Sequence, residues 1–242
     1  MRTTRLYTPQ PLAHGQDLQL DDAPAHHLAV VLRARQGQAV QLFNGDGRDY
    51  SAVITAIDRR CVQLRIEDSA PVATESPLHA TLAIGVSRGE RFDWVLQKAT
   101  ELGVSAIQPL WTERCAVRLD DRRQQKKHQH WQQILVSASE QSGRATLPDL
   151  HPALALDIWL ARCDATLRLL LHPDIDSAAR DAAAPARLAL LVGPEGGFSD
   201  AEVAAARAAG FQGLRLGPRI LRTETAPVAA LTLAQSWWGD FI

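Results

Sequence analysis

The chain has 242 residues and a formal net charge of -1, with 22% charged and 46% hydrophobic side chains. This balance is typical of a globular protein, and it excludes a strongly basic nucleic-acid coat protein while leaving room for a local basic patch. No apolar run approaches the roughly 18 residues of a membrane span, and the polar N-terminus lacks the apolar core of a signal peptide. We therefore expect a cytoplasmic protein without a membrane partner.

Residues 1–70 are predicted to form a small β-barrel. Two runs of alternating apolar and polar residues flank Asn-Gly-Asp-Gly at 44–47, a hairpin signal because Asn and Gly accept a positive φ angle. A third strand is expected at 61–68, and a short helix is expected to begin at Pro24. The stretch 71–77 contains two prolines and little that is apolar, which predicts a linker between two domains.

Residues 78–242 are predicted to form an α/β domain with a mainly parallel sheet. Strands are expected at 80–86, 104–111, 166–173, 187–194 and 213–217, and helices at 91–103, 121–141, 200–210 and 226–238. The third and fourth of these strands are continuous apolar runs, as expected for strands buried on both faces of a sheet. Strands that alternate with helices are typical of this fold class.

Two corners rich in glycine and proline follow two of the predicted strands. Residues 193–197 read Gly-Pro-Glu-Gly-Gly, and Ser199 with Glu202 forms a capping box for the next helix. Residues 217–219 read Gly-Pro-Arg and have the same placement after a strand. Ligands of open α/β sheets bind beyond the carboxyl ends of strands, and glycines let a ligand approach the backbone closely. Together the corners could hold a planar polar ligand such as adenine, although a single such corner is more often a structural turn.

Metal and disulfide chemistry is not expected. The three cysteines are far apart and form no Cys-x-x-Cys pair, so reduced thiols are the simplest interpretation. The histidine pairs at 26–27 and at 128 and 130 lack a neighbouring cysteine or third ligand.

The sequences "LLVGPEGGFSDAEV" and "LRLGPRILRTETA" together resemble the SPOUT class of RNA methyltransferases, and most closely the RsmE family. That family methylates N3 of a uridine in 16S ribosomal RNA, with S-adenosylmethionine as the methyl donor. Further matches are "SRGERFDWVLQKATELGVSAIQPLWTERC" at 87–115 and "EQSGR" at 140–144, and the resemblance spans nearly the whole chain. It implies a PUA-like RNA-binding barrel, a trefoil-knotted methyltransferase domain at 78–242 and a homodimer. The RNA substrate would be free or part of the small ribosomal subunit.

The resemblance also implies where the cofactor binds, namely at the two corners and at one further strand end. The expected cofactor contacts are Leu171, His172, Gly193, Glu195, Gly196, Leu216, Gly217, Ile220, Leu221 and Thr223. Backbone groups and apolar walls would recognise the adenine.

Methylation at uracil N3 requires the removal of a proton and the stabilisation of negative charge on O2 and O4. The uridine must also be unpaired or extruded, because N3 lies on its Watson–Crick edge. Arginine is suited to stabilise this negative charge, since its guanidinium stays positively charged and donates to two acceptors. Arg222 and Arg144 are the candidates for this role, and Glu140 is a candidate base or base-orienting group. A solvated surface position is an equally good interpretation of any single arginine, and Arg222 is favoured by its place beside the second corner.

RNA binding requires cations near the reaction centre. The expected RNA contacts are Arg88, Arg91, Lys98, Arg114 and Arg118. A stretch of mixed charge is also typical of a solvated face, so the charge pattern by itself does not decide between RNA binding and a solvated surface.

Two other functions stay open. A non-catalytic RNA-binding or assembly protein would be expected to carry damaged corners, whereas both corners here are intact. A SPOUT methyltransferase that acts on another RNA position would be expected to carry a different N-terminal module. The sequence does not identify the modified nucleotide, the general base, the oligomeric state or whether the substrate is naked RNA or an assembled subunit.

Overall fold

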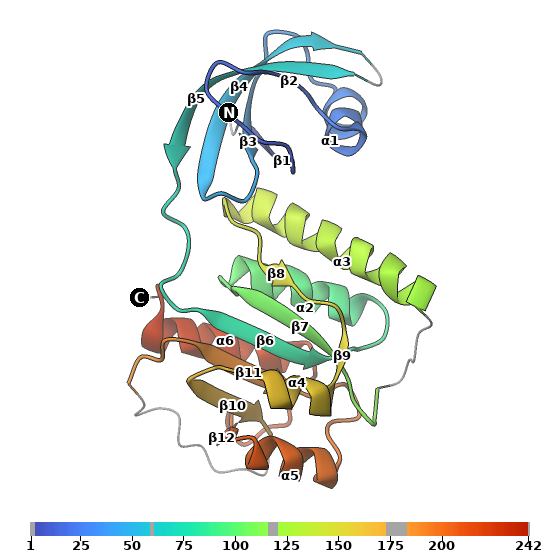
Figure 1. The fold of residues 1–242 in the computed structure, drawn as a ribbon, viewed down its shortest axis with the longest axis vertical. Helices are drawn as coiled ribbons and strands as arrows, with labels where there is room; N and C mark the ends of the chain where they lie inside the picture. The colour runs from blue at the N-terminus through green and yellow to red at the C-terminus, as the bar shows by residue number, and fades with distance from the viewer. Residues whose placement is uncertain (1–2, 59–60, 116–120, 173–182, 242) are drawn as a thin grey trace. The chain divides into compact units, whose positions relative to one another are not determined.

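The computed structural model describes residues 3–58, 61–115, 121–172 and 183–241, and its chain divides into two compact units (Figure 1). The first unit comprises Met1–Glu75 and Ser139–Leu147, and the second comprises Ser76–Ala138 and Pro148–Ile242. The segment 139–147 therefore belongs with the N-terminal part of the chain, a grouping that nothing in the local sequence indicates.

Within the described residues, the first unit is built on a five-stranded sheet with the strand order β1-β3-β4-β5-β2. These strands are β1 (Thr4–Tyr7), β2 (Asp17–Gln19), β3 (Ala39–Phe43), β4 (Arg48–Ile57) and β5 (Val62–Pro71). β1 and β3 run parallel, whereas β3–β4, β4–β5 and β2–β5 are antiparallel. The hairpin expected around 44–47 is confirmed, because β3 and β4 pair across a connection in which Gly45 and Gly47 have φ angles of 96° and 82°.

One face of this sheet and a short helix enclose the core of the first unit. Val62, Leu64 and Ile66 alternate along β5 and are fully buried, as their spacing predicts. The helix α1 (Asp22–His26) begins two residues before Pro24 and continues into a π-helical turn, η1 (His27–Val31). Pro24 therefore lies in the first turn, where a helix has no internal acceptor for the missing N–H group.

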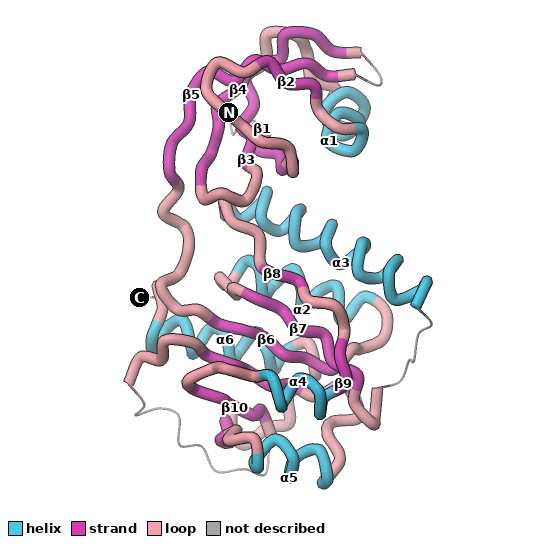
Figure 2. Tube along the Cα trace, viewed as in Figure 1, coloured by secondary structure: helices cyan, strands magenta, loops and turns pink. Residues whose placement is uncertain are grey.

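The second unit is built on a parallel sheet with the strand order β12-β10-β11-β6-β7-β8, and β9 also pairs with β7. Figure 2 draws the strands in magenta and the helices in cyan. Its strands are β6 (Ala80–Gly85), β7 (Ala106–Trp111), β8 (Asp149–Leu150), β9 (Leu154–Ala155), β10 (Leu167–Leu171), β11 (Leu188–Val192) and β12 (Gln212–Leu214). All the strand pairs described in this sheet are parallel, which confirms the expected α/β class.

Helices cover both faces of this parallel sheet. They are α2 (Glu90–Glu101), α3 (Asp121–Ser142), α4 (Leu156–Arg162), α5 (Asp200–Ala208) and α6 (Thr225–Trp238). Side chains of α2, α3 and α6 pack on one face and those of α4 and α5 on the other. The sequence did not predict α4, β8 or β9, because such short elements carry too few residues to show a period.

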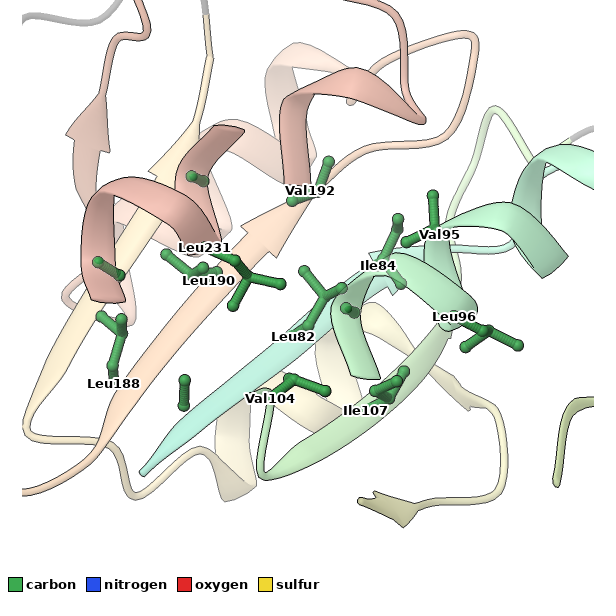
Figure 3. Close-up of a cluster of buried hydrophobic side chains, with 14 of the residues drawn as sticks. Leu82, Ile84, Val95, Leu96, Val104, Ile107, Leu188, Leu190, Val192 and Leu231 are labelled. Atoms are coloured by element: carbon green, nitrogen blue, oxygen red, sulfur yellow. The ribbon is translucent and has the colours of Figure 1, made fainter. Parts of the chain in front are cut away.

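The core on the α2–α3–α6 face combines side chains of neighbouring strands with side chains of the helices that cover them, and most of them are aliphatic (Figure 3). Leu82 and Ile84 of β6 and Leu190 of β11 point to this face and are fully buried. Ala83, between the first two, and Leu191, which follows Leu190, contribute to the opposite core. This alternation explains the continuous apolar runs, because each residue of a central parallel strand is covered by a helix on one face or the other.

The core position Leu190 gives a direct test of this packing. The substitution Leu190→Ala should lower the free energy of unfolding by about 2–5 kcal/mol, because it removes buried methyl groups and leaves a cavity. Urea unfolding followed by circular dichroism measures the change. The control is Ile158→Ala on α4. The Ile158 side chain is 43% exposed, so its truncation should lower the free energy of unfolding much less. Equal effects of the two substitutions would contradict this account of the core.

Candidate functional site

A cavity of about 340 Å³ lies at the carboxyl ends of β10, β11 and β12. These three strands are neighbours in the sheet and run parallel, so that their carboxyl ends lie at the same edge. The residues directly after β10, the corner after β11 and the long connection from β12 to α6 form its walls, and Arg114 lines it from the segment that follows β7.

The cavity collects all the residues that were expected to contact a cofactor. The lining includes Leu171, His172, Gly193, Glu195, Gly196, Leu216, Gly217, Ile220, Leu221 and Thr223. Their common position was expected from the sequence, and their binding of a cofactor stays a prediction.

Several further residues line the cavity that were not among the expected cofactor contacts. They are Val192, Pro194, Gly197, Phe198, Leu214, Arg219 and Ala226, together with Arg114, which was expected to contact RNA. Pro194, Gly197 and Arg219 belong to the two corners, and the other four of the first seven lie in the strands, the connection or the helix next to them, so the corners were the available signal. Arg114 lies far from both corners in the sequence, and only the packing of the strands brings it to them.

The first corner is held by its own backbone and by close packing. The Gly197 N–H donates to the Pro194 carbonyl oxygen at 2.9 Å, and Gly197 has a φ angle of 67°. A Cβ atom at Gly85, the last residue of β6, would lie 2.5 Å from Cδ of Pro194, so only glycine fits there. A Cβ atom at Gly196 would lie 2.9 Å from Cβ of Arg114. The glycines therefore let the corner pack against its neighbours.

The helix that follows the first corner begins with the expected capping box. The Ser199 side chain accepts a hydrogen bond from the Glu202 N–H at 3.3 Å, and the Glu202 carboxylate accepts one from the Ser199 N–H at 2.9 Å. The second oxygen of Glu202 accepts a hydrogen bond from the Glu113 N–H at 2.8 Å. Through Glu202, the start of α5 is thus also hydrogen-bonded to the segment next to Arg114.

The second corner leaves β12 earlier than expected, because the strand ends at Leu214. Gly217 has a φ angle of 106°, a conformation that L side chains rarely adopt, and no atom lies within 4 Å of the position of a Cβ there. Ile220 is 87% exposed, which is unusual for an isoleucine that lines a cavity. The connection ends where the N–H groups of Thr225 and Ala226 donate to the Arg222 carbonyl oxygen.

The chemistry of the lining suits a small organic ligand with an apolar part and a few polar groups. Leucine, valine and phenylalanine side chains provide apolar walls, and Glu195, His172 and Arg114 are among the polar groups. Ligand cavities typically combine an apolar lining with a few placed polar groups and occupy about 300–1,000 Å³.

Of the three candidate catalytic residues, Arg222 lies closest in sequence to the cavity. Its neighbours Leu221 and Thr223 line the cavity, and its own side chain is 79% exposed. Nη1 of Arg222 lies 3.9 Å from Oε1 of Glu224, and an exposed pair at this distance contributes little to stability.

Glu140 and Arg144 belong to the first unit, and both have partners there. Glu140 Oε1 accepts a hydrogen bond from the Tyr7 N–H at 2.9 Å. Arg144 forms an ion pair with Glu75, with Nη2 and Oε2 2.5 Å apart, and its side chain is only 5% exposed. Arg5 donates to the Arg144 carbonyl oxygen at 2.8 Å. These contacts attach the end of α3 and the segment after it to the N-terminal strands.

The residues expected to bind RNA are only partly brought together. Arg88, Arg91 and Arg114 line a shallow hollow of about 870 Å³ that shares Arg114, Glu195 and Gly196 with the cavity. Lys98 lies further along α2 and pairs with Glu101 at 2.8 Å. Arg118 lies outside the described residues.

Among the described residues, no group of three or more histidine, cysteine or acidic side chains is placed to hold a metal ion. No helix in the described part of the chain has the length and apolar character needed to cross a membrane.

Comparison with known proteins identifies relatives of both units. Residues 74–235 match the family described as RNA methyltransferase domain, and residues 20–67 match the RNA methyltransferase PUA domain. The chain is 35% identical to a ribosomal RNA small subunit methyltransferase E from Synechocystis sp., over 88% of this chain and 70% of the relative. It is 31% identical to the protein of the same name from Buchnera aphidicola subsp. Schizaphis graminum, over 99% of this chain and 98% of the relative.

Two solved structures are similar to the whole chain. A methyltransferase from Legionella pneumophila, in complex with S-adenosylmethionine, is 42% identical with a TM-score of 0.97, and the match covers 100% of both chains. A ribosomal RNA small subunit methyltransferase E from Neisseria gonorrhoeae, bound to S-adenosylmethionine, is 39% identical with a TM-score of 0.93, again over 100% of both chains.

The contacts of Glu140 predict a pH dependence of stability. Burial raises the pKa of this carboxyl group above its ordinary value, and the Tyr7 N–H, His27 and Arg5 oppose that shift only in part. A raised pKa in the folded state means that the carboxyl group contributes stability below its unfolded pKa and loses it as the pH rises through the folded value.

The substitution Glu140→Gln should remove this pH dependence, because glutamine keeps the acceptor for the Tyr7 N–H but does not ionise. Urea unfolding across the acidic to neutral range measures it, and the variant should gain stability relative to the wild type as the pH rises. A difference between the two proteins that does not change with pH would show that burial of this carboxylate has no cost.

Proposed function

Because the chain belongs to the RsmE family of SPOUT-class RNA methyltransferases, we propose that it methylates N3 of a uridine in 16S ribosomal RNA, with S-adenosylmethionine as the methyl donor. The observation that carries the proposal is the meeting of all ten expected cofactor contacts in one cavity at the carboxyl edge of the parallel sheet. The RNA methyltransferase family and the names of the relatives support the reaction class, and the uridine N3 atom comes from the sequence resemblance.

The fold class expected from the sequence is confirmed. The chain has the SPOUT-type trefoil-knotted methyltransferase domain with a parallel sheet, preceded by a small PUA-like β-barrel domain. In both of the similar solved structures the relative holds S-adenosylmethionine.

The cavity in this chain fits that cofactor. S-adenosylmethionine supplies a methyl group on a sulfonium, and its adenine needs apolar walls and hydrogen-bonding backbone groups. Leu171, Leu216 and Leu221 provide apolar lining, and Gly193 and Gly217 bring the backbone to the cavity without side chains. The position of a Cβ atom at Gly217 faces open space, so that a ligand can approach the backbone there.

Arg222 has the main catalytic role in this proposal. Its guanidinium extends from the connection whose neighbouring residues line the cavity, and it would donate hydrogen bonds to uracil O2 or O4 as negative charge develops there. The proposal also keeps Glu140 for removal of the N3 proton or for orienting the base, and Arg144 as a second cation. Both have partners within the first unit, so the proposed mechanism depends mainly on Arg222.

The RNA and the assembly state complete the proposal. The PUA-like unit would bind ribosomal RNA, by itself or within the small subunit, and Arg88, Arg91 and Arg114 would contact it from the second unit. We also propose that the protein is a homodimer and acts in the cytoplasm, where ribosomal RNA is present.

The reaction can be tested in cells that lack the gene. Nucleoside mass spectrometry of small-subunit RNA should show that 3-methyluridine is lost on deletion and restored by the wild-type gene. The Arg222→Ala variant should restore it poorly, with a rate reduced by about 10²–10³, as for the loss of one donor to a developing oxyanion. Arg207→Ala changes an exposed arginine of α5 that lines neither the cavity nor the hollow, and it should restore the modification fully.

An unchanged level of 3-methyluridine in the deletion strain would overturn the proposed reaction. A loss of some other modified nucleoside would point to a different RNA position for the same class of enzyme. Full activity of Arg222→Ala would remove this residue from the mechanism while leaving the reaction in place.

Gly217 provides a test of the cofactor site. The substitution Gly217→Ala should weaken S-adenosylmethionine binding about tenfold, because a left-handed backbone costs an L residue roughly 1–2 kcal/mol and the free loop can relax away from it. Isothermal titration calorimetry measures the affinity. Gly210→Ala is the matched control, since Gly210 has a φ angle of 84° but does not line the cavity. Equal losses in both variants would count against a cofactor at the second corner.

A further inference from the structure

The shallow hollow beside the cavity is a feature of the second unit that the cofactor site does not explain. Its lining consists of Arg88, Gly89, Glu90, Arg91, Arg114, Glu195 and Gly196. Three of these residues also line the cavity, so the two sites share a wall. A ligand in the hollow would therefore lie directly beside the cofactor.

The charges in the hollow are arranged around one carboxylate. Glu195 Oε1 accepts a hydrogen bond from the Arg88 N–H at 2.9 Å, and the same oxygen lies 3.5 Å from Nη1 of Arg91. Arg114 donates from Nη1 to the Gly196 carbonyl oxygen at 3.1 Å, at the other side of the shared wall. Glu90 is the second acidic residue in the lining. Three arginine residues thus line the hollow, and one carboxylate oxygen already lies between the Arg88 N–H and the Arg91 guanidinium.

We propose that a phosphate of the RNA backbone binds in this hollow, in contact with Arg88, Arg91 and Arg114, and that Glu195 occupies part of this anion site until the RNA displaces it. The inference rests on the proposed function, because it takes RNA as the substrate. Guanidinium groups and backbone N–H groups are the usual partners of phosphate oxygens, and such contacts position a nucleic acid on its protein.

The shared wall gives this phosphate a role in the reaction. A phosphate held beside the cofactor cavity fixes the backbone next to the nucleotide that is to be methylated, whatever that nucleotide's sequence context. Glu195 would then set the strength of RNA binding, because its negative charge competes with the phosphate for Arg91 and for the Arg88 N–H.

The competition predicts opposite effects for two substitutions. Arg91→Ala should weaken RNA binding and reduce the slope of log affinity against log salt by about 0.7–0.9, the change for one lost phosphate contact. Glu195→Gln keeps the shape and a hydrogen-bond acceptor for the Arg88 N–H but loses the charge. It should strengthen RNA binding about two- to fivefold, the range that an exposed ion pair allows.

Fluorescence anisotropy with a labelled transcript of small-subunit ribosomal RNA, over a series of salt concentrations and without cofactor, measures both effects. Arg207→Ala removes an exposed arginine from α5 outside the hollow and should leave the salt slope unchanged. Weaker RNA binding by Glu195→Gln would overturn the competition, since it would mean that the carboxylate only supports the hollow. An unchanged affinity and slope for Arg91→Ala would overturn the phosphate site.

The outcome is separable from that of the proposed reaction. Formation of 3-methyluridine by the wild type, together with unchanged RNA binding by both variants, would remove the phosphate site alone. If the wild type forms no 3-methyluridine, the proposed uridine N3 reaction is wrong. If Arg91→Ala nevertheless lowers the salt slope of RNA binding, the hollow is still supported as a phosphate site.

Discussion

The parallel pairing of β10 with both β11 and β12 is the constraint on which the cavity depends. Parallel neighbours bring three carboxyl ends to one edge, so that three connections from distant parts of the chain meet there. The helices on both faces make this pairing stable, because they cover both faces of the central strands. The glycines at the end of β6 and in the first corner then permit the close packing that shapes the wall.

A second network organises the first unit around Arg5. Its guanidinium pairs with Asp49 at 2.7 Å, lies 3.9 Å from the centre of the Phe43 ring and donates to the carbonyl oxygens of Ser139 and Arg144. Arg144 in turn pairs with Glu75. Several simultaneous partners offset the desolvation cost of burying a charged side chain. Here the partners of Arg5 attach a segment that is remote in sequence to the N-terminal strands.

Glu195 lines both the cavity and the neighbouring hollow. Its carboxylate holds the Arg88 N–H and approaches the Arg91 guanidinium, while its residue also lines the cavity. If the cofactor binds in the cavity and RNA phosphate in the hollow, as we propose, a single side chain borders both ligands. The same glycine-rich corner would then serve the methyl donor through its backbone and the RNA through its one acidic side chain.

The sequence by itself determined the features whose causes are local. The hairpin at 44–47 follows from residues that accept positive φ angles, the start of α5 follows from the capping box of Ser199 and Glu202, and the glycine corners mark the strand ends where a ligand can approach. Only the tertiary structure decided that 139–147 joins the first unit and that Arg88, Arg91 and Arg114 meet beside Glu195. These groupings depend on strand order and packing between distant segments, which no local pattern of residues encodes.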